Sequence, residues 1–267
     1  MPSPVFDLQA EFSGSGAGWT SIWSDVRAAA PITIRYGING TSVNDRVAGA
    51  GAMSFALDNS VMNSAGSAGY YSPDHANKRS GFELGIRCRL SATYSGSTFY
   101  KFFGTLAGIH PMAGQYRDRY TLCSTVDWMD EAARHPLNIV AVQTDKTGDQ
   151  LIATIIGNMK RAPAASTLDV GKDTFPYAGD TWRDERTMAL AAFQNIAMSE
   201  MGYIYVKGDS NTGGLLRFEN RHTRITTTTP ASTLNNTMVN LTARRMRSNV
   251  YNRFKVTAHP RTVDSGA

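Results

Sequence analysis

The sequence has no long hydrophobic run. Its longest apolar stretches, such as Met188 to Ala192 and Met201 to Val206, fall far short of the roughly 20 residues that a membrane-spanning helix needs. The N-terminus, MPSPVFDLQAEFSGSG, also lacks a basic segment followed by a continuous apolar one, which is the pattern of a secretory signal. We therefore expect no membrane insertion by these residues, and synthesis inside a cell.

Cysteine is scarce. The 267 residues include two cysteines, Cys88 and Cys123, and no Cys-x-x-Cys pair that would suggest a zinc site. In GFELGIRCRL, strand alternation places Leu84 and Cys88 on one apolar face, whereas in RYTLCSTV the apolar face contains Leu122 and Val126, and Cys123 points away. We therefore expect no disulfide between them, and reduced thiols agree with assembly in the cytoplasm.

Patterns of catalytic or metal-binding residues are missing as well. The five histidines lie far apart without the spacing of metal ligands, and no serine stands in a Gly-x-Ser-x-Gly motif. The glycine-rich stretch GINGTS lacks the lysine of a phosphate-binding loop. The acidic pair Asp127 and Asp130 stands at an expected helix start, where capping explains it. We predict no enzymatic activity, no cofactor and no metal ion.

The charge is mildly basic, with a formal net charge of +5 and a pI near 9.2. Most basic residues are mixed with acids, which is typical of an ordinary solvated surface rather than of nucleic-acid binding. The densest basic segment is ARRMRSNVYNRFKV, from Ala243 to Val256, in which Tyr251 and Phe254 stand among the arginines. This segment fits either a surface for an anionic partner or an ordinary pair of basic strands.

Alternation with a period of two residues dominates the first half of the chain. Segments near 32–38, 47–57, 81–90, 99–109 and 119–126 alternate between apolar and polar residues and are separated by turns rich in Gly, Asn, Ser and Pro. Five such strands indicate an antiparallel barrel or sandwich. Glycines around the second strand pair permit the bulges and tight corners that a small barrel needs.

The period changes after residue 126. Short helices are expected at 127–135 and 147–159, capped by Asp127 and Thr147. The strongest helical pattern covers 184–202, with Asp184 as N-cap and with Phe193 and Ile196 in its apolar stripe. A hairpin, YIYVKGDSNTGGLLRFENR, follows directly.

These patterns predict an α+β fold that is mainly antiparallel β. We expect an N-terminal β-barrel domain over residues 1–135 and a mixed α/β insert with the long helix and the hairpin over residues 136–230. After a Thr-rich linker, residues 231–267 are expected to begin a second β domain.

The order of these segments resembles the tail hub proteins of long-tailed bacteriophages and prophages, which are similar to the baseplate hub of contractile tails. In that family a strand ending in Leu-Asp-Asn leads to a Tyr-Ser-Pro turn, two further strands, and a strand whose final Asp starts a short helix. The matching residues are Leu57, Asp58, Asn59, Tyr71, Ser72, Pro73, Gly104, Leu106, Ile109 and Asp127. The chain departs from the family in SGFELG, where Pro-Gly is common, and in a longer insert from Val61 to Gly69.

The second half continues the resemblance with a helix, a Ser-Glu-x-Gly turn and a hairpin that ends in Glu-x-Arg. The matching residues are Ser199, Glu200, Gly202, Glu219 and either Arg221 or Arg224. The resemblance implies a hub-type β-barrel in a structural virion protein at the tail tip or baseplate, assembled in the host cytoplasm. It implies a homotrimer that contacts the ring of the distal tail protein, tail fibre or tip proteins and the C-terminus of the tape-measure protein, with DNA only passing through the lumen.

Candidate contact residues follow from the resemblance and from side-chain chemistry. Tyr70, Tyr71 and Pro73 form a rigid aromatic turn, and Arg244, Arg245, Arg247 and Arg253 offer bidentate bonds, so we expect these residues at subunit or ring interfaces. Two alternatives stay open at this point. One is a tail-associated cell-wall hydrolase, with its catalytic module in a C-terminal extension, and the other is a receptor-binding or carbohydrate-binding tail-tip module.

Overall fold

The computed structural model describes residues 3–14, 16, 18–40, 45–114, 118–183, 185–208 and 214–226. The chain divides into two compact units, residues 1–223 and residues 224–267. Of the second unit only residues 224–226, in helix α4 (Thr223–Thr226), are among the described residues. The second β domain predicted for residues 231–267 therefore lies outside the described residues.

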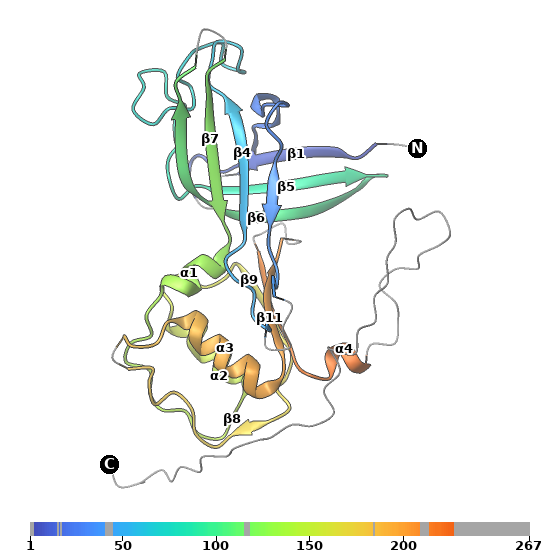
Figure 1. Ribbon diagram of the computed structural model, residues 1–267, viewed down its shortest axis with the longest axis vertical. Helices are drawn as coiled ribbons and strands as arrows, with labels where there is room; N and C mark the ends of the chain where they lie inside the picture. The colour runs from blue at the N-terminus through green and yellow to red at the C-terminus, as the bar shows by residue number, and fades with distance from the viewer. Residues whose placement is uncertain are drawn as a thin grey trace. The chain divides into compact units, whose positions relative to one another are not determined.

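The first half of the chain forms a seven-stranded antiparallel sheet (Figure 1). Its strands are β1 (Val5–Ala10), β2 (Thr20–Ser21), β3 (Thr33–Arg35), β4 (Ala52–Asp58), β5 (Arg87–Tyr94), β6 (Ser97–Met112) and β7 (Tyr120–Val126), in the spatial order β2-β1-β5-β6-β7-β4-β3. Strand β6 serves two neighbours, since its first part pairs with β5 and its second part with β7. The sheet turns a corner along β6, and β4 and β7 run across the direction of β1 and β5 (Figure 1).

The two edge strands, β2 and β3, belong to one continuous segment, residues 20–35. Near its start the amide of Ile22 donates to the carbonyl oxygen of Leu8 in β1 over 2.8 Å, and near its end Ile34 pairs with Met53 in β4. The chain passes between the two edges through the short 3-10 helix η1 (Trp23–Asp25). Among the described residues β2 and β3 do not pair with each other. The mainly antiparallel α+β fold is confirmed, but the strand pairing does not close the predicted barrel.

A hydrophobic core fills the inner face of this sheet, and both cysteines lie in it as free thiols. The predicted face of β7 was wrong, because Cys123 is buried and Leu122 is exposed. Two threonines flank Cys123 on the same inner face, and their hydroxyl groups donate to the carbonyl oxygens of Tyr71 and Met53 over 2.8 and 3.1 Å. These hydrogen bonds allow polar side chains inside the sheet, so hydrophobicity alone misassigns the strand.

The segment before β5 also differs from its prediction. The strand begins at Arg87, and residues 81–86 form a loop in which Gly81 and Gly85 have φ of +75° and +85°. Such positive φ values suit glycine and interrupt the alternation that the sequence suggested. Leu84, expected in the core, is therefore 64% exposed.

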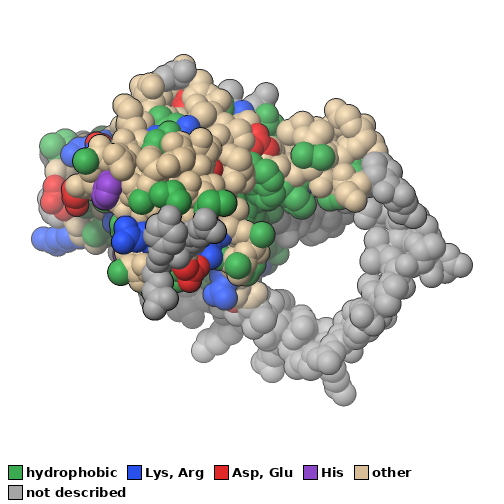
Figure 2. Space-filling model, turned by 90° about the horizontal axis from the view of Figure 1, so that it is seen from above, with side chains coloured by type: hydrophobic (Ala, Val, Ile, Leu, Met, Phe, Trp, Pro, Cys, Tyr) green, Lys and Arg blue, Asp and Glu red, His purple; other side chains and the backbone are tan. Residues whose placement is uncertain are grey.

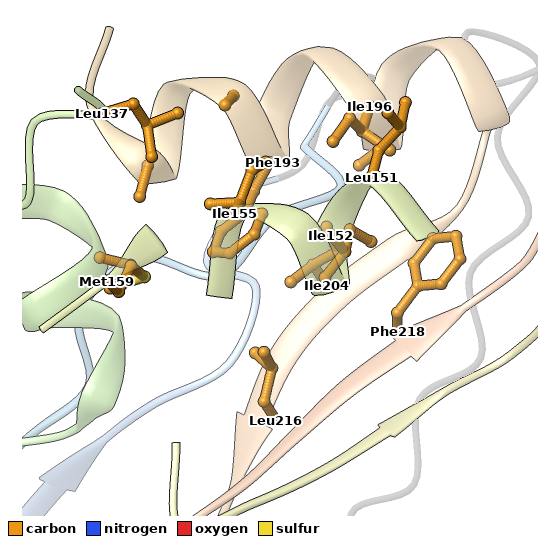
Figure 3. Close-up of a cluster of buried hydrophobic side chains, with 14 of the residues drawn as sticks. Leu137, Leu151, Ile152, Ile155, Met159, Phe193, Ile196, Ile204, Leu216 and Phe218 are labelled. Carbon is orange, nitrogen blue, oxygen red and sulfur yellow. The ribbon is translucent and has the colours of Figure 1, made fainter. Parts of the chain in front are cut away.

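The second half of the chain builds a separate core from helices and a small sheet (Figures 1 and 3). Its elements are α1 (Trp128–Arg134), β8 (Lys146–Thr147), α2 (Gly148–Asn158), β9 (Ala165–Leu168), β10 (Thr174–Phe175), α3 (Ala189–Glu200), β11 (Tyr203–Lys207) and β12 (Leu215–Glu219). The two predicted short helices and the hairpin are confirmed. Both caps also form, since Asp127 accepts from the amide of Met129 over 3.0 Å and Gln150 accepts from the amide of Thr147 over 3.3 Å.

The long helix starts later than predicted. Helix α3 begins at Ala189, after Met188 in an extended conformation, whereas the sequence predicted Asp184 as its N-cap; residue 184 itself lies outside the described residues. The amide of Leu137 donates to the carbonyl oxygen of Thr187 over 2.9 Å, and the amide of Ala189 donates to that of His135 over 2.9 Å. Pairing with the chain after α1 holds this segment extended, so the helix cannot begin there.

Three strands of the second core form one mixed sheet, in which β12 pairs antiparallel with β11 and parallel with β9. The outer edge of β11 is met by residues 46–48 from the first half of the chain. The amide of Ala48 donates to the carbonyl oxygen of Ile204 over 2.8 Å, and the amide of Ile204 donates to that of Arg46 over 2.9 Å. This backbone pairing joins the two halves.

The described residues thus hold two hydrophobic cores, one built from residues between 8 and 123 and the other from residues between 129 and 218. We propose that residues 1–135, 136–230 and 231–267 form three successive domains. No helix within the described residues is long and apolar enough to cross a membrane.

Candidate functional site

One apolar face continues beyond the core of the first sheet, on the ribbon formed by β1, β5 and β6. The cross-strand row Leu8, Leu90 and Phe102 is buried in the core. The next row outward pairs Phe6 with Ala92 and Ala92 with Phe99. Because directly opposite residues share a face, this outer row extends the surface of the core.

Four aromatic side chains remain partly open to solvent on this extension. Phe6, Trp23, Tyr94 and Phe99 are 41%, 39%, 41% and 50% exposed, and the rings of Phe6 and Trp23 stack with their centroids 6.2 Å apart. We call these four residues the arm face. Green side chains lie along this ribbon in the space-filling view (Figure 2). Grouped exposed aromatics of this kind are typical of protein interfaces.

A bulge in β6 places Phe99 on the arm face. The register between β5 and β6 shifts after Leu90, so Lys101 has no direct partner, and the alternation of β6 changes by one residue. As a result Phe99, rather than Tyr100, shares a face with Phe102.

The opposite face of the same ribbon carries arginines stacked on aromatic rings. The guanidinium of Arg89 lies 4.2 Å from the ring centroid of Trp19 and 4.9 Å from that of Tyr100. Trp19 also meets Phe103 edge to face, with centroids 5.7 Å apart. Arg87 forms an ion pair with the buried carboxylate of Glu11. These contacts fix the side chains in place and so reduce the entropy lost when a partner binds.

The predicted contact residues in the turn at 70–73 separate into two kinds. Tyr71 is fully buried, its hydroxyl donates to Oδ2 of Asp25 over 2.5 Å, and Nη1 of Arg79 donates to that hydroxyl over 3.0 Å. Burial and the nearby Asp25 raise the pKa of Tyr71 far above its usual range. Tyr71 is therefore a core residue of this chain, whereas Tyr70 and Pro73 are half-buried and keep an open surface.

The loop that contains this turn is tied down by polar side chains. The carboxylate of Asp25 accepts from the amide and the hydroxyl of Ser64 over 2.7 and 2.6 Å. Asn59 accepts from the amide of Tyr71 over 2.8 Å, and Asn63 donates to two carbonyl oxygens of the loop. The insert 61–69 is thus an ordered surface loop whose shape is set before any partner arrives.

Other residues of the family resemblance have structural roles. A Cβ atom on Gly104 would lie 2.3 Å from the carbonyl oxygen of Val126, so only glycine fits between β6 and β7 there. Glu200 is buried and accepts from the amides of Lys172 and Asp173 over 2.5 and 3.2 Å. Arg221 forms a bidentate ion pair with Asp173 over 2.6 and 2.9 Å.

Asp127 is a carboxylate whose pKa is raised toward neutral pH. It is buried at the start of α1, and burial raises its pKa from 3.8 to about 6 despite hydrogen bonds from the backbone. A Cβ atom on Gly51 would lie 2.3 Å from the Asp127 carboxylate, which shows how closely the backbone packs on it. Among the described residues no group of three potential metal ligands surrounds this or any other position.

Asp127→Asn is expected to change how stability depends on pH. The raised pKa means that the folded state holds a proton between about pH 4 and 6 that the unfolded state has released, so Asp127 makes the wild type lose stability as pH rises through this window. Asparagine keeps the cap without the buried charge. The free energy of unfolding of the variant should match that of the wild type near pH 4 and exceed it by about 2–3 kcal/mol at pH 7. Urea unfolding at several pH values measures this, and a difference that does not vary with pH would contradict it.

Some contact residues had no signal in the sequence, and others cannot be placed. Asp25 lies 46 residues from Tyr71 and Arg79 lies eight residues from it, and neither spacing is a local pattern that links them. The exposed position of Phe99 depends on the bulge, which alternation alone does not reveal. The predicted contacts Arg244, Arg245, Arg247 and Arg253 lie outside the described residues.

Comparisons with known proteins give matches to structures alone. No protein-family model matches the chain, and no curated protein matches it significantly. The 43 kDa tail protein of prophage MuSo2 from Shewanella oneidensis is similar with a TM-score of 0.48 and 14% identity, over 81% of this chain and 54% of that protein. The tail protein from Neisseria meningitidis MC58 is similar with a TM-score of 0.46 and 11% identity, over 80% of this chain and 51% of that protein.

An Escherichia coli component of the type VI secretion system, described as similar in structure to the bacteriophage T4 tail proteins gp27 and gp5, matches with a TM-score of 0.40 and 10% identity. That match covers 73% of this chain and 48% of the other protein. The chain thus spans about half the length of each of these three proteins. Two of these three structures are described as tail proteins, and the third is described as a secretion-system component with structural similarity to tail proteins.

Proposed function

We propose that this chain is a structural protein of a phage tail tip, a hub that joins the tail tube and distal tail ring to the tip complex. The arm face carries the proposal, because four partly exposed aromatic residues continue the core of a β-sheet and need another protein surface to cover them. The order of motifs in the sequence indicates which assembly supplies that surface. Assembly requires no catalysis by this chain.

The finer parts of the proposal follow from the resemblance. The hub is a homotrimer, and each copy supplies the sheet of residues 1–135 and the second β domain predicted for residues 231–267. Three copies with two β domains each match a ring of six distal tail subunits. The hub also encloses the C-terminus of the tape-measure protein and holds tip or fibre proteins, so the chain resides in the virion. No particular observation favours a hydrolase or a carbohydrate-binding module.

A double substitution on the arm face tests the proposal. Phe6→Ser with Phe99→Ser is expected to abolish incorporation of the full chain into tails, because both rings lose the contact area that a neighbour covers. Leu122→Ser is the matched control, since Leu122 is an exposed apolar residue of the same sheet on another face. Incorporation is measured in tails purified from cells that produce each variant, with the subunit number taken from symmetry analysis of the tail tip.

Normal incorporation of the double variant would contradict the role of the arm face. Three copies at the tip, touching a six-copy ring, would support the hub. Six equivalent copies, or a position on the tube shaft, would instead indicate a tube or distal-ring protein. Lysis of host cell wall by the purified chain, lost on replacing one carboxylate, would favour the hydrolase.

A further inference from the structure

A groove of about 680 Å³ lies between the outer face of the first sheet and the second core. Its floor is formed by β5 and β6 at Arg87, Phe103 and Thr105. One wall is the loop at 81–86, and the other contains Trp128 of α1 together with the chain near Arg161. The groove is separate from the arm face, none of whose residues lines it.

The walls of the groove offer apolar surface in fixed positions. Leu84 is 64% exposed and lines the groove, where the positive φ of Gly85 beside it holds the loop outward. The indole Nε1 of Trp128 donates to the carbonyl oxygen of Arg161 on the same wall over 2.9 Å, which holds the ring in place. An exposed leucine and a held tryptophan that line the same groove offer surface for an apolar side chain or an aliphatic stem.

The charges of the groove oppose those of the chain as a whole. Five carboxylates line it, against the guanidinium groups of Arg87 and Arg161, whereas the whole chain carries a formal net charge of +5. Arg87 is already paired with Glu11, and Glu83 and Asp130 make ion pairs with Lys78 and Arg134 over 3.0 Å. Unlike the Arg87 pair, whose Glu11 carboxylate is buried, the Glu83 and Asp130 pairs each have a well-exposed member. Pairs of this kind contribute little to stability, so Glu83 and Asp130 can pair instead with a cation from a partner.

Glu131 forms no ion pair among the described residues. It follows Asp130 directly in α1, and both residues line the groove. Trp128 lines the groove as well, so this wall combines two carboxylates with an aromatic ring. An arginine side chain has both parts of the complementary chemistry, an apolar stem for Leu84 and Trp128 and a planar cation for the ring and the carboxylates.

We propose that this groove binds a peptide segment of a partner protein, in which arginine side chains are flanked by aromatic or aliphatic residues. Charge complementarity selects the arginines, and Leu84 and Trp128 select the apolar neighbours. The site goes beyond the hub role proposed above and does not depend on the arm face.

A labelled synthetic peptide in which arginines alternate with tryptophan and leucine serves as the probe, because it has the composition proposed for the partner segment. Titration of the full chain, followed by fluorescence anisotropy, is expected to show saturable binding that weakens as salt is added. Leu84→Ser and Glu131→Lys should each weaken binding by about tenfold or more, the ratio that corresponds to 1.4 kcal/mol. A peptide with every Arg replaced by Glu should not bind.

Two matched variants separate groove binding from general effects. Asp74→Lys makes the same kind of charge change at an exposed position outside the groove, and Met62→Ser removes an exposed apolar side chain elsewhere, so both should bind the probe like the wild type. Absence of saturable binding, equal binding of the glutamate peptide, or wild-type binding by Glu131→Lys would overturn the proposal. All four variants must show the wild-type thermal unfolding profile.

The two proposals can fail independently. Variants of the arm face, Phe6→Ser with Phe99→Ser, should bind the probe normally even though they no longer enter tails. Conversely, the arm-face variant could enter tails normally while Glu131→Lys no longer binds the probe. That result would support the groove as a binding site and contradict the assembly role of the arm face.

Discussion

Phe193→Ala is expected to lower the free energy of unfolding by about 3–5 kcal/mol, the usual cost of removing a fully buried phenylalanine ring. Phe193 is 0% exposed in the middle of α3 and belongs to the second core. Its ring lies 6.2 Å from that of Trp128 in α1, centroid to centroid. Side chains from α2, α3, β11 and β12 converge around it (Figure 3), so little can move in to fill the space.

Chemical denaturation followed by far-UV circular dichroism measures the change. Met198→Ala is the matched control, because Met198 lies on the same helix but is exposed, and it should shift the free energy of unfolding by no more than about 0.5 kcal/mol. A loss of less than about 1 kcal/mol for Phe193→Ala would mean that this face of α3 does not belong to a tightly packed core.

Asp25→Ala is expected to lower the free energy of unfolding by about 2–4 kcal/mol, because it leaves the buried Tyr71 hydroxyl without its carboxylate acceptor and removes two further hydrogen bonds from Ser64. The Asp25 carboxylate is 2% exposed and accepts from the amide and hydroxyl of Ser64 and from the hydroxyl of Tyr71. Alanine removes all three hydrogen bonds. Of the two partners of the Tyr71 hydroxyl described above, Arg79 and Asp25, it leaves Arg79. The loop at 59–79 should also become sensitive to proteolysis, since Asp25 ties it to η1.

Thermal unfolding and limited proteolysis of the full chain test this prediction. Asp118→Ala is the control, since Asp118 forms an exposed ion pair with Arg27 and such pairs contribute about 0–1 kcal/mol. If Asp25→Ala is as stable as Asp118→Ala, or if the loop stays resistant to protease, the network does not hold the loop.

The turn that contains Tyr70 and Tyr71 shows which features a local sequence pattern can predict and which it cannot. The resemblance in the sequence placed the end of a strand at Leu57, Asp58 and Asn59, and β4 does end at Asp58, whose side chain accepts from the amide of Ser60 over 2.8 Å. It also predicted Tyr70 and Tyr71 as surface contacts. Tyr71 is buried because Asp25, Arg79 and the ring of Phe82 enclose it, and those residues come from distant parts of the chain or from a turn that the pattern did not reveal.

By itself the sequence determined the elements whose signals are local. The alternating strands, the caps at Asp127 and Thr147 and the hairpin of β11 and β12 were predictable, because their hydrogen bonds and periodicity act over a few residues. The tertiary structure alone decided which face of β7 is buried, where α3 begins, and how the bulge at Lys101 exposes Phe99. Each depends on partners remote in sequence, since pairing with distant backbone groups can outweigh a local preference of a few tenths of a kcal/mol per residue.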